Sequence, residues 1–129
     1  MILRIIEATQ AKTGTTILVD NEPYAVRSND ISKTGKHGAS KCRIEAIGVF
    51  SDKKKIIAVP GHERFEVPSV NKGKAQVLNL EGDTVSVMDL ESFENFSIPY
   101  LPELKDQLQP ESQVEYWEIS GKKVIMRVL

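Results

Sequence analysis

Lys36 is the residue of this chain whose surroundings are most specific for chemistry. It lies with His37 between Gly35 and Gly38, inside a polar segment, 32–41, that holds no aliphatic side chain larger than alanine. Glycine adopts left-handed backbone angles without a Cβ clash, so a tight turn centred on this lysine is sterically favourable. The sequence therefore predicts a loop over residues 32–41 that presents the amine of Lys36.

Two enzymatic interpretations of these residues are weak. A phosphate-binding loop needs a glycine five residues before Gly35 and a Ser or Thr after the lysine, where this chain has Asp30 and His37. A nucleophile pair of Cys42 and His37 lacks a third orienting group, and Cys42 falls on the apolar face of an expected strand. We expect no catalytic residue and no enzyme activity.

Composition argues against metal, disulfide and membrane chemistry. Cys42 is the single cysteine, and with only His37 and His62 the chain has no paired-cysteine zinc pattern, so no metal and no bound cofactor are expected. His62 follows a Pro-Gly pair and is expected on the surface. The longest aliphatic run, 56–59, is far shorter than the roughly 20 residues that span a bilayer, and no signal peptide is evident. The expected location is the cytoplasm, without membrane contact.

Positive charge is concentrated around the predicted loop. Residues 1–70 carry 11 basic and 8 acidic side chains, whereas residues 71–129 carry 6 and 10. Such a basic cluster is typical either of a solubilising face or of phosphate binding, and its coincidence with a glycine-flanked turn favours nucleic acid. The candidate RNA contacts are Arg27, Lys33, Lys41 and Arg43.

The hydrophobic pattern is mostly period two and predicts an all-β protein. The first half reads as five short strands, 15–19, 23–28, 41–50, 54–59 and 64–67. The second half reads as two hairpins with glycine in the turn, at 75–90 and 114–128, and one short helix over 102–108. The proline and glycine of segment 67–73 are typical of a linker. The predicted domains are residues 1–70 and 71–129.

Five aromatic side chains of the second half offer rings for base stacking, but the net charge of this half argues against broad phosphate binding. We expect most of these rings to lie in the core and the contacts of this half with a partner to be local. The residues are Phe93, Phe96, Tyr100, Tyr116 and Trp117.

The string Ser32-Lys33-Thr34-Gly35-Lys36-His37-Gly38, followed by Lys41, resembles the hypusination loop of the translation initiation factor 5A family. Val67-Pro68-Ser69-Val70 is similar to the interdomain segment of that family, and the likeness covers essentially the whole chain. The chain looks most like the archaeal form, and the family is homologous to bacterial elongation factor P. One departure is Ala39-Ser40, where eukaryotic members typically carry His-Ala.

This resemblance implies an SH3-like barrel followed by an OB-fold domain with one short helix. It implies that deoxyhypusine synthase transfers an aminobutyl group from spermidine to Lys36, giving deoxyhypusine or hypusine. The implied partners are the ribosome and peptidyl-tRNA, whose acceptor end the modified lysine stabilises so that peptide bonds form at proline-rich stalls, with a further role in termination. The chain is expected to act as a monomer.

The basic residues near Lys36 in the sequence are expected to make its side-chain amine more reactive. Lys33, Lys41 and a protonated His37 would disfavour the charged form of Lys36 by like-charge repulsion, and an amine attacks only when it is unprotonated. The alternative function is a general RNA-binding or RNA-chaperone module with a basic loop, in which many cations share the binding energy.

Overall fold

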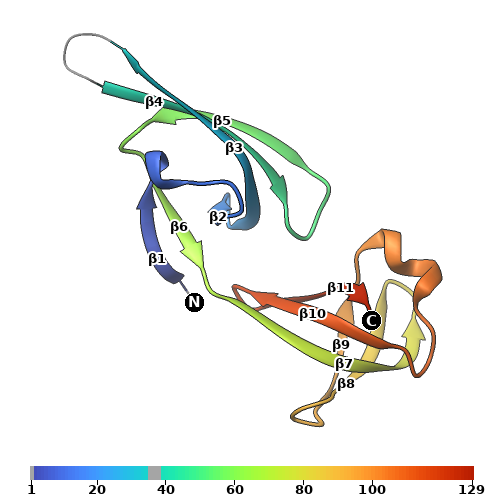
Figure 1. Ribbon diagram of the computed structural model, residues 1–129. Helices are drawn as coiled ribbons and strands as arrows, with labels where there is room; N and C mark the ends of the chain where they lie inside the picture. Colours follow the sequence, from blue (N-terminus) through green and yellow to red (C-terminus); the bar gives the residue numbers. More distant parts are fainter. Residues whose placement is uncertain (1, 35–38) are drawn as a thin grey trace. The chain divides into compact units, whose positions relative to one another are not determined.

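The computed structural model of the chain describes residues 2–34 and 39–129 (Figure 1). The chain divides into two compact units, Met1–Ser69 and Val70–Leu129. The boundary between the units falls inside the expected linker, 67–73, but that segment is not an extended linker, because strands β6 (Arg64–Pro68) and β7 (Val70–Glu81) leave only Ser69 between them. Pro68 is compatible with this arrangement since it ends its strand, where a missing N–H costs little.

The first unit is built from short antiparallel strands and one turn of 3-10 helix. Strands β2, β3, β4 and β5 form one sheet in that order, and β1 pairs with β6 in a separate two-stranded sheet. Both β1 and the 3-10 helix η1 were missed by the sequence interpretation. The elements are β1 (Ile2–Glu7), η1 (Ala8–Gln10), β2 (Thr16–Val19), β3 (Glu22–Thr34), β4 (Ala39–Gly48), β5 (Lys54–Pro60) and β6.

The core of the first unit follows the alternation expected for β4. Cys42, Ile44 and Ala46 are each at most 2% exposed and pack with Tyr24 and other buried side chains. The intervening residues of the strand face away from this core, as period-two patterning requires. The prediction that Cys42 lies among apolar partners is therefore confirmed.

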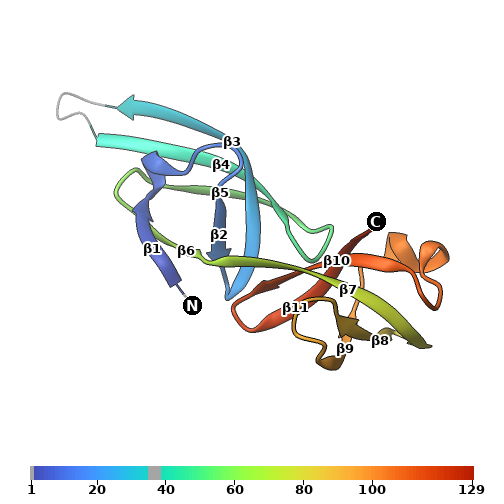
Figure 2. The same cartoon turned by 60° about the horizontal axis from the view of Figure 1, so that its bottom comes forward.

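The second unit is a five-stranded antiparallel sheet in the order β11-β10-β7-β8-β9 (Figure 2). A parallel bridge between Tyr100 and Ile125 brings the end of β9 to β11, so the two edges of this sheet meet. Strand β9 was not identified from the sequence. The remaining elements are β8 (Thr84–Asp89), β9 (Asn95–Pro99), the 3-10 helix η2 (Pro102–Gln107), β10 (Gln113–Ile119) and β11 (Lys122–Val128).

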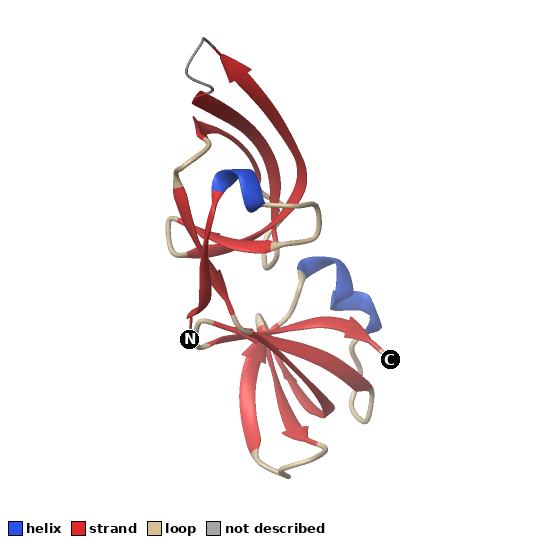
Figure 3. Cartoon of the chain, turned by 60° about the vertical axis from the view of Figure 1, so that its left-hand side comes forward, coloured by secondary structure: helices blue, strands red, loops and turns tan. Residues whose placement is uncertain are grey.

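Turn chemistry in the second unit agrees with the sequence interpretation. Gly82 (φ 81°) joins β7 to β8, and Ser120 (φ 52°) with Gly121 (φ 80°) joins β10 to β11. Positive φ at both central residues is the signature of a type I′ hairpin turn. The short helix is confirmed as η2, of 3-10 type, with proline at its start (Figure 3).

The aromatic rings of the second unit lie mostly at the edge of its core. Phe96, Tyr100 and Tyr116 are partly buried and pack against the core cluster, whereas Phe93 is 69% exposed. The ring of Trp117 lies outside that cluster, and the Nζ of Lys72 is 4.4 Å from its centroid. We predicted that most of these rings lie in the core. Three of the five do pack against it, but they are only partly buried.

A buried carboxylate organises the turn between β8 and β9. Asp89 is 7% exposed, and its Oδ1 accepts hydrogen bonds from the backbone N–H groups of Glu91 (2.8 Å) and Ser92 (2.9 Å). The Tyr116 hydroxyl donates to its Oδ2. These bonds, the tyrosine's first, lower the pKa of Asp89 against the opposing effect of burial. Gly73 fits here because a Cβ would lie 2.4 Å from the Tyr116 ring.

Tyr116→Phe is expected to cost about 1–3 kcal/mol of unfolding free energy near neutral pH, because a buried acceptor loses its donor. The lowered pKa of Asp89 stabilises the folded state above the ordinary aspartate range, and this stabilisation is lost as the pH falls through the folded value. Urea unfolding at neutral and acid pH should therefore show a cost that shrinks in acid. Tyr100→Phe is the control, since that hydroxyl donates to the carbonyl of Gly82. A cost for Tyr116→Phe that is independent of pH would contradict this account.

Candidate functional site

The β3–β4 hairpin extends past the strand beside it. Its antiparallel pairing runs from Tyr24–Gly48 to Thr34–Ala39, whereas β5 pairs with β4 only as far as Lys41–Pro60. The outermost part of the hairpin is therefore a two-stranded arm (Figures 1 and 3). Residues 35–38, which connect the two strand ends, lie outside the described residues.

The extent of the predicted loop was wrong. Ser32, Lys33 and Thr34 belong to β3, and the segment from Ala39 to Lys41 belongs to β4, so strand pairing takes up all but the central part of 32–41. The sequence interpretation relied on the polar character of the segment. A short two-stranded arm of this kind buries few side chains and needs no apolar alternation, so polarity alone could not separate it from a loop.

Four of the predicted site residues lie outside the described part of the chain. They are Gly35, Lys36, His37 and Gly38. The described neighbours in sequence, Thr34 and Ala39, are directly paired across the hairpin. The proposed modification site therefore lies between the paired ends of β3 and β4 in the sequence. The conformation expected for Lys36 stays a prediction.

The candidate RNA contacts are exposed but do not share one face. Lys41 pairs with Ser32 and Arg43 pairs with Asp30, so both cations lie on the same face of β4 because they are two residues apart. Lys33 is one residue from Ser32 and lies on the opposite face of β3. Arg27 lies at a register shift between Val26 and Ser28. The structure thus groups Lys41 with Arg43 and separates the other two.

Near its outer end, the hairpin is held by a close approach of Gly61 to Ser40. The N–H of Gly61 donates to the carbonyl of Ser40 (2.8 Å), and the N–H of Thr9 donates to the carbonyl of Gly61 (3.3 Å). A Cβ on Gly61 would lie 2.8 Å from the Cβ of Ser40 and 2.9 Å from the Cγ2 of Thr9. Only glycine allows the β5–β6 turn to pack this tightly against β4.

Asn29 fixes the other strand of the hairpin. Its Nδ2 donates to the carbonyls of Ala8 (2.8 Å) and Ala11 (3.0 Å), at the two ends of the 3-10 helix η1. Both alanines are almost fully buried. The hairpin is thereby tied to the core through both of its strands. Neither Asn29 nor Gly61 was identified from the sequence; the Pro60-Gly61 pair signalled a turn but not its neighbour.

A second run of basic residues is largely neutralised. Lys53, Lys54 and Lys55 are consecutive, and they lie next to Glu22 (3.9 Å), Glu45 (4.0 Å) and Asp20 respectively. The contact with Lys55 lowers the pKa of Asp20, chiefly through a hydrogen bond. These exposed pairs add little stability, but they reduce the positive potential at this end of the sheet.

The remaining titratable candidates are a buried thiol and an exposed imidazole. Burial raises the pKa of the Cys42 thiol, which disfavours the thiolate that a nucleophile requires. His62 is exposed in the turn before β6. Within residues 2–34 and 39–129, no cluster of three or more His, Cys, Asp or Glu side chains is arranged to hold a metal ion. The helices of this described part include none long and apolar enough to cross a membrane.

Comparison with known proteins assigns the chain to a family. A family model described as Translation initiation factor 5A-like, N-terminal, matches residues 4–62. A protein named Translation initiation factor 5A from Caldivirga maquilingensis is 44% identical over 130 residues and is aligned over 98% of both chains. The chain belongs to the translation initiation factor 5A family. It is therefore a translation factor, and the resemblance drawn from residues 32–38 is confirmed.

Other members of the family support the same assignment. The Translation initiation factor 5A of Pyrococcus horikoshii is 39% identical over 127 residues, covering 95% of this chain and 92% of the relative. The solved structure of Eukaryotic translation initiation factor 5A from Methanococcus jannaschii has a TM-score of 0.84 and 36% identity, covering 98% of this chain and 94% of that one. The prediction of an SH3-like barrel followed by an OB-fold is confirmed. No enzyme family is indicated by these matches.

Gly61→Ala is expected to cost about 1–3 kcal/mol of unfolding free energy, because the new methyl group has no room beside Ser40 and Thr9. The same change should speed hydrogen exchange of the residue-61 amide, whose acceptor is the carbonyl of Ser40. Adding Ser40→Gly and Thr9→Ser to Gly61→Ala removes the obstructing carbons and should recover part of the loss. A Gly61→Ala variant as stable as the native chain would show that the contact does not hold the hairpin.

Proposed function

We propose that this translation factor acts on the ribosome, in the cytoplasm, through a spermidine-derived modification of Lys36. Deoxyhypusine synthase would extend the lysine amine by an aminobutyl group, giving deoxyhypusine or, after hydroxylation, hypusine. The sequence Ser-Lys-Thr-Gly-Lys-His-Gly within a confirmed member of the family supports this assignment.

The single observation that carries the proposal is the length of the hairpin. Pairing of β3 with β4 continues beyond β5 to the Thr34–Ala39 pair, and residues 35–38 join those two strand ends. A side chain borne on a narrow, two-stranded arm reaches a recessed target that the body of the barrel cannot enter. The anchoring at Gly61 and Asn29 holds the base of the arm against the core.

The proposed target is the acceptor end of peptidyl-tRNA. A modified Lys36 carries two amines on a slender chain, and amines donate to phosphate oxygens and ribose hydroxyls of unpaired RNA. Holding the acceptor end in a productive orientation would speed peptide transfer at proline-rich stalls, and assist termination, without chemical catalysis by the factor. The chain would act as a monomer in this role.

The alternative is a general RNA-binding or RNA-chaperone module that uses the basic surface. Arg27, Lys33, Lys41 and Arg43 are all exposed, which favours some electrostatic contact with RNA. Their division between the two faces of the hairpin gives less support to one continuous phosphate-binding track. The modified-lysine function therefore has the stronger support.

Lys36→Arg keeps the positive charge but removes the amine that the synthase would modify. The expected result is complete loss of the aminobutyl adduct by peptide mass spectrometry and loss of the stimulation of peptide synthesis at consecutive prolines. Lys33→Arg, on the same hairpin, is the matched control and should retain both. A Lys36→Arg factor with native activity would favour the general RNA-binding module.

A further inference from the structure

An exposed aromatic side chain stands in the turn between β8 and β9 of the second unit (Figure 1). Phe93 is 69% exposed and lies outside the cluster in which Phe96, Tyr100 and Tyr116 pack. Its φ of 61° lies in the left-handed region. Single exposed apolar residues are ordinary on a protein surface. A bulky aromatic with left-handed backbone angles is rare, however, because its Cβ crowds the following carbonyl.

The turn that holds Phe93 is fixed by its backbone hydrogen bonds. The N–H of Phe93 donates to the carbonyl of Asp89, and the N–H of Asp89 donates to the carbonyl of Glu94, both at 2.9 Å. The N–H of Glu94 donates to Ser92 Oγ (3.3 Å), and the N–H of Leu90 donates to a carbonyl of β7 (2.9 Å). With the two bonds to the Asp89 side chain, every N–H of this turn has an acceptor.

The ring of Phe93 contributes to none of these bonds. Asp20 and Asn21, which also have positive φ, are of the residue types enriched in the left-handed region. Glycine or asparagine would adopt the φ of Phe93 with less strain, so the turn itself does not require an aromatic residue. Strained positions that the surroundings hold in place cluster at functional sites. The geometry therefore indicates a contact outside the chain.

The charge near the ring restricts the kind of partner. Glu91 and Glu94 are exposed on either side of Phe93 in the sequence. Lys72 and Lys74 line a hollow beside Glu91, but a second glutamate lines it with them. Residues 71–129 as a whole carry 6 basic and 10 acidic side chains. Stacking of Phe93 on an RNA base is therefore disfavoured, since each base brings phosphates that the carboxylates repel.

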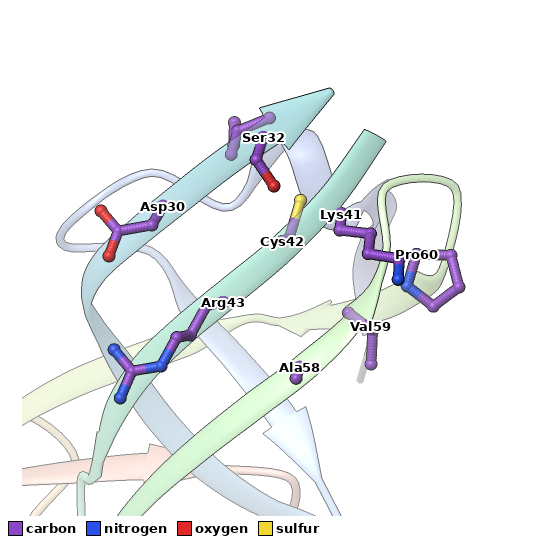
Figure 4. Close-up of a pocket in the computed structure, with 9 residues that line it drawn as sticks. Asp30, Ser32, Lys41, Cys42, Arg43, Ala58, Val59 and Pro60 are labelled. Atoms are coloured by element: carbon purple, nitrogen blue, oxygen red, sulfur yellow. The ribbon is translucent and has the colours of Figure 1, made fainter. Parts of the chain in front are cut away.

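A second copy of this chain is poorly suited as the partner. A hollow of about 600 Å³ lies along β3, β4 and β5 and has cations in its lining. Figure 4 shows Lys41 directed toward Pro60, whereas Arg43 and Asp30 point the other way. Its two cations therefore do not converge on one point, as the rim of a pocket for an aromatic ring between two carboxylates would require.

We propose that Phe93 anchors a protein-docking surface, and that its ring enters an apolar pocket with a basic rim on a protein of the ribosome. Proteins that bind RNA carry basic surfaces. An arginine of the rim would lie over the ring and pair with Glu91 or Glu94. Aromatic anchors on a preorganised backbone dominate the binding energy of interfaces. The inference rests on the proposed function only in taking the ribosome as the target, and it does not involve Lys36.

The first test measures binding of the full chain and its variants to salt-washed ribosomes from its own cells by co-sedimentation. Phe93→Gly should weaken binding about tenfold, as loss of an interface anchor does. It should not lower stability in urea unfolding, because glycine accepts the φ of 61°. Phe93→Tyr keeps the ring and should bind like the native chain. Leu80→Ala, which truncates a 52% exposed leucine of β7, is the control and should change nothing.

The carboxylates give a test whose sign depends on the partner. Replacing both flanking residues, Glu91→Gln with Glu94→Gln, should weaken binding and reduce its salt dependence, because a basic rim loses its partners. If the turn contacted RNA, the same change would strengthen binding by removing repulsion from phosphates, and the inference would be wrong. Glu111→Gln, at an exposed residue of the same unit, should leave binding unchanged.

Photochemical crosslinking identifies the class of the partner directly. A diazirine analogue of phenylalanine at position 93 of the full chain forms a carbene on illumination, and a carbene inserts into protein and RNA alike. On ribosomes, the expected adduct is with a protein, so that protease destroys it and ribonuclease does not. An adduct with ribosomal RNA would overturn the inference.

Native affinity of Phe93→Gly for ribosomes would also overturn it. Repeating the series with Lys36→Arg removes any contribution of a modified lysine, and the loss caused by Phe93→Gly should persist there. A Lys36→Arg factor with native activity would refute the modified-lysine function and leave the Phe93 result in place. Failure of the native chain to sediment with ribosomes would instead refute both.

Discussion

The register of the β3–β4 ladder is the constraint on which the rest of the first unit depends. It buries Cys42, Ile44 and Ala46 against the core and leaves Lys41 and Arg43 on the outer face. Because side chains alternate strictly, a slip of one residue would exchange these two sets and place charge in the core. The buried face therefore fixes where the cations lie, and the same pairing continues outward to the Thr34–Ala39 pair.

Two contacts hold the strands of this hairpin against the rest of the first unit. The close packing of Gly61 against Ser40 holds β4, and the Asn29 side chain holds β3 to the ends of η1. Neither contact involves the lysine proposed to be modified. The positioning role proposed above would depend on this arrangement, because a misplaced arm would lose the orientational gain even with its chemical group intact.

In the second unit, too, a glycine allows close packing next to a polar side-chain contact. Gly73 makes room for the ring of Tyr116, whose hydroxyl reaches the buried carboxylate of Asp89 and so fixes the β8–β9 turn. Its lysines are interspersed with acidic groups in the sequence, and three of its aromatic rings, those of Phe96, Tyr100 and Tyr116, pack at the edge of its core. The four basic side chains proposed to contact RNA all lie on the β3–β4 hairpin of the first unit.

The sequence by itself determined the all-β class, the family, the candidate lysine, the glycine turns of the second unit and the apolar face of β4, because each depends on local residue types or on period-two alternation. Only the tertiary structure decided that polar residues 32–34 and 39–41 are strands, that strands occupy all of 67–73 except Ser69, and that Lys33 faces away from Lys41. These features depend on which backbone groups find partners across the sheet. Contacts such as Gly61 with Ser40 join residues distant in sequence, and no local pattern encodes them.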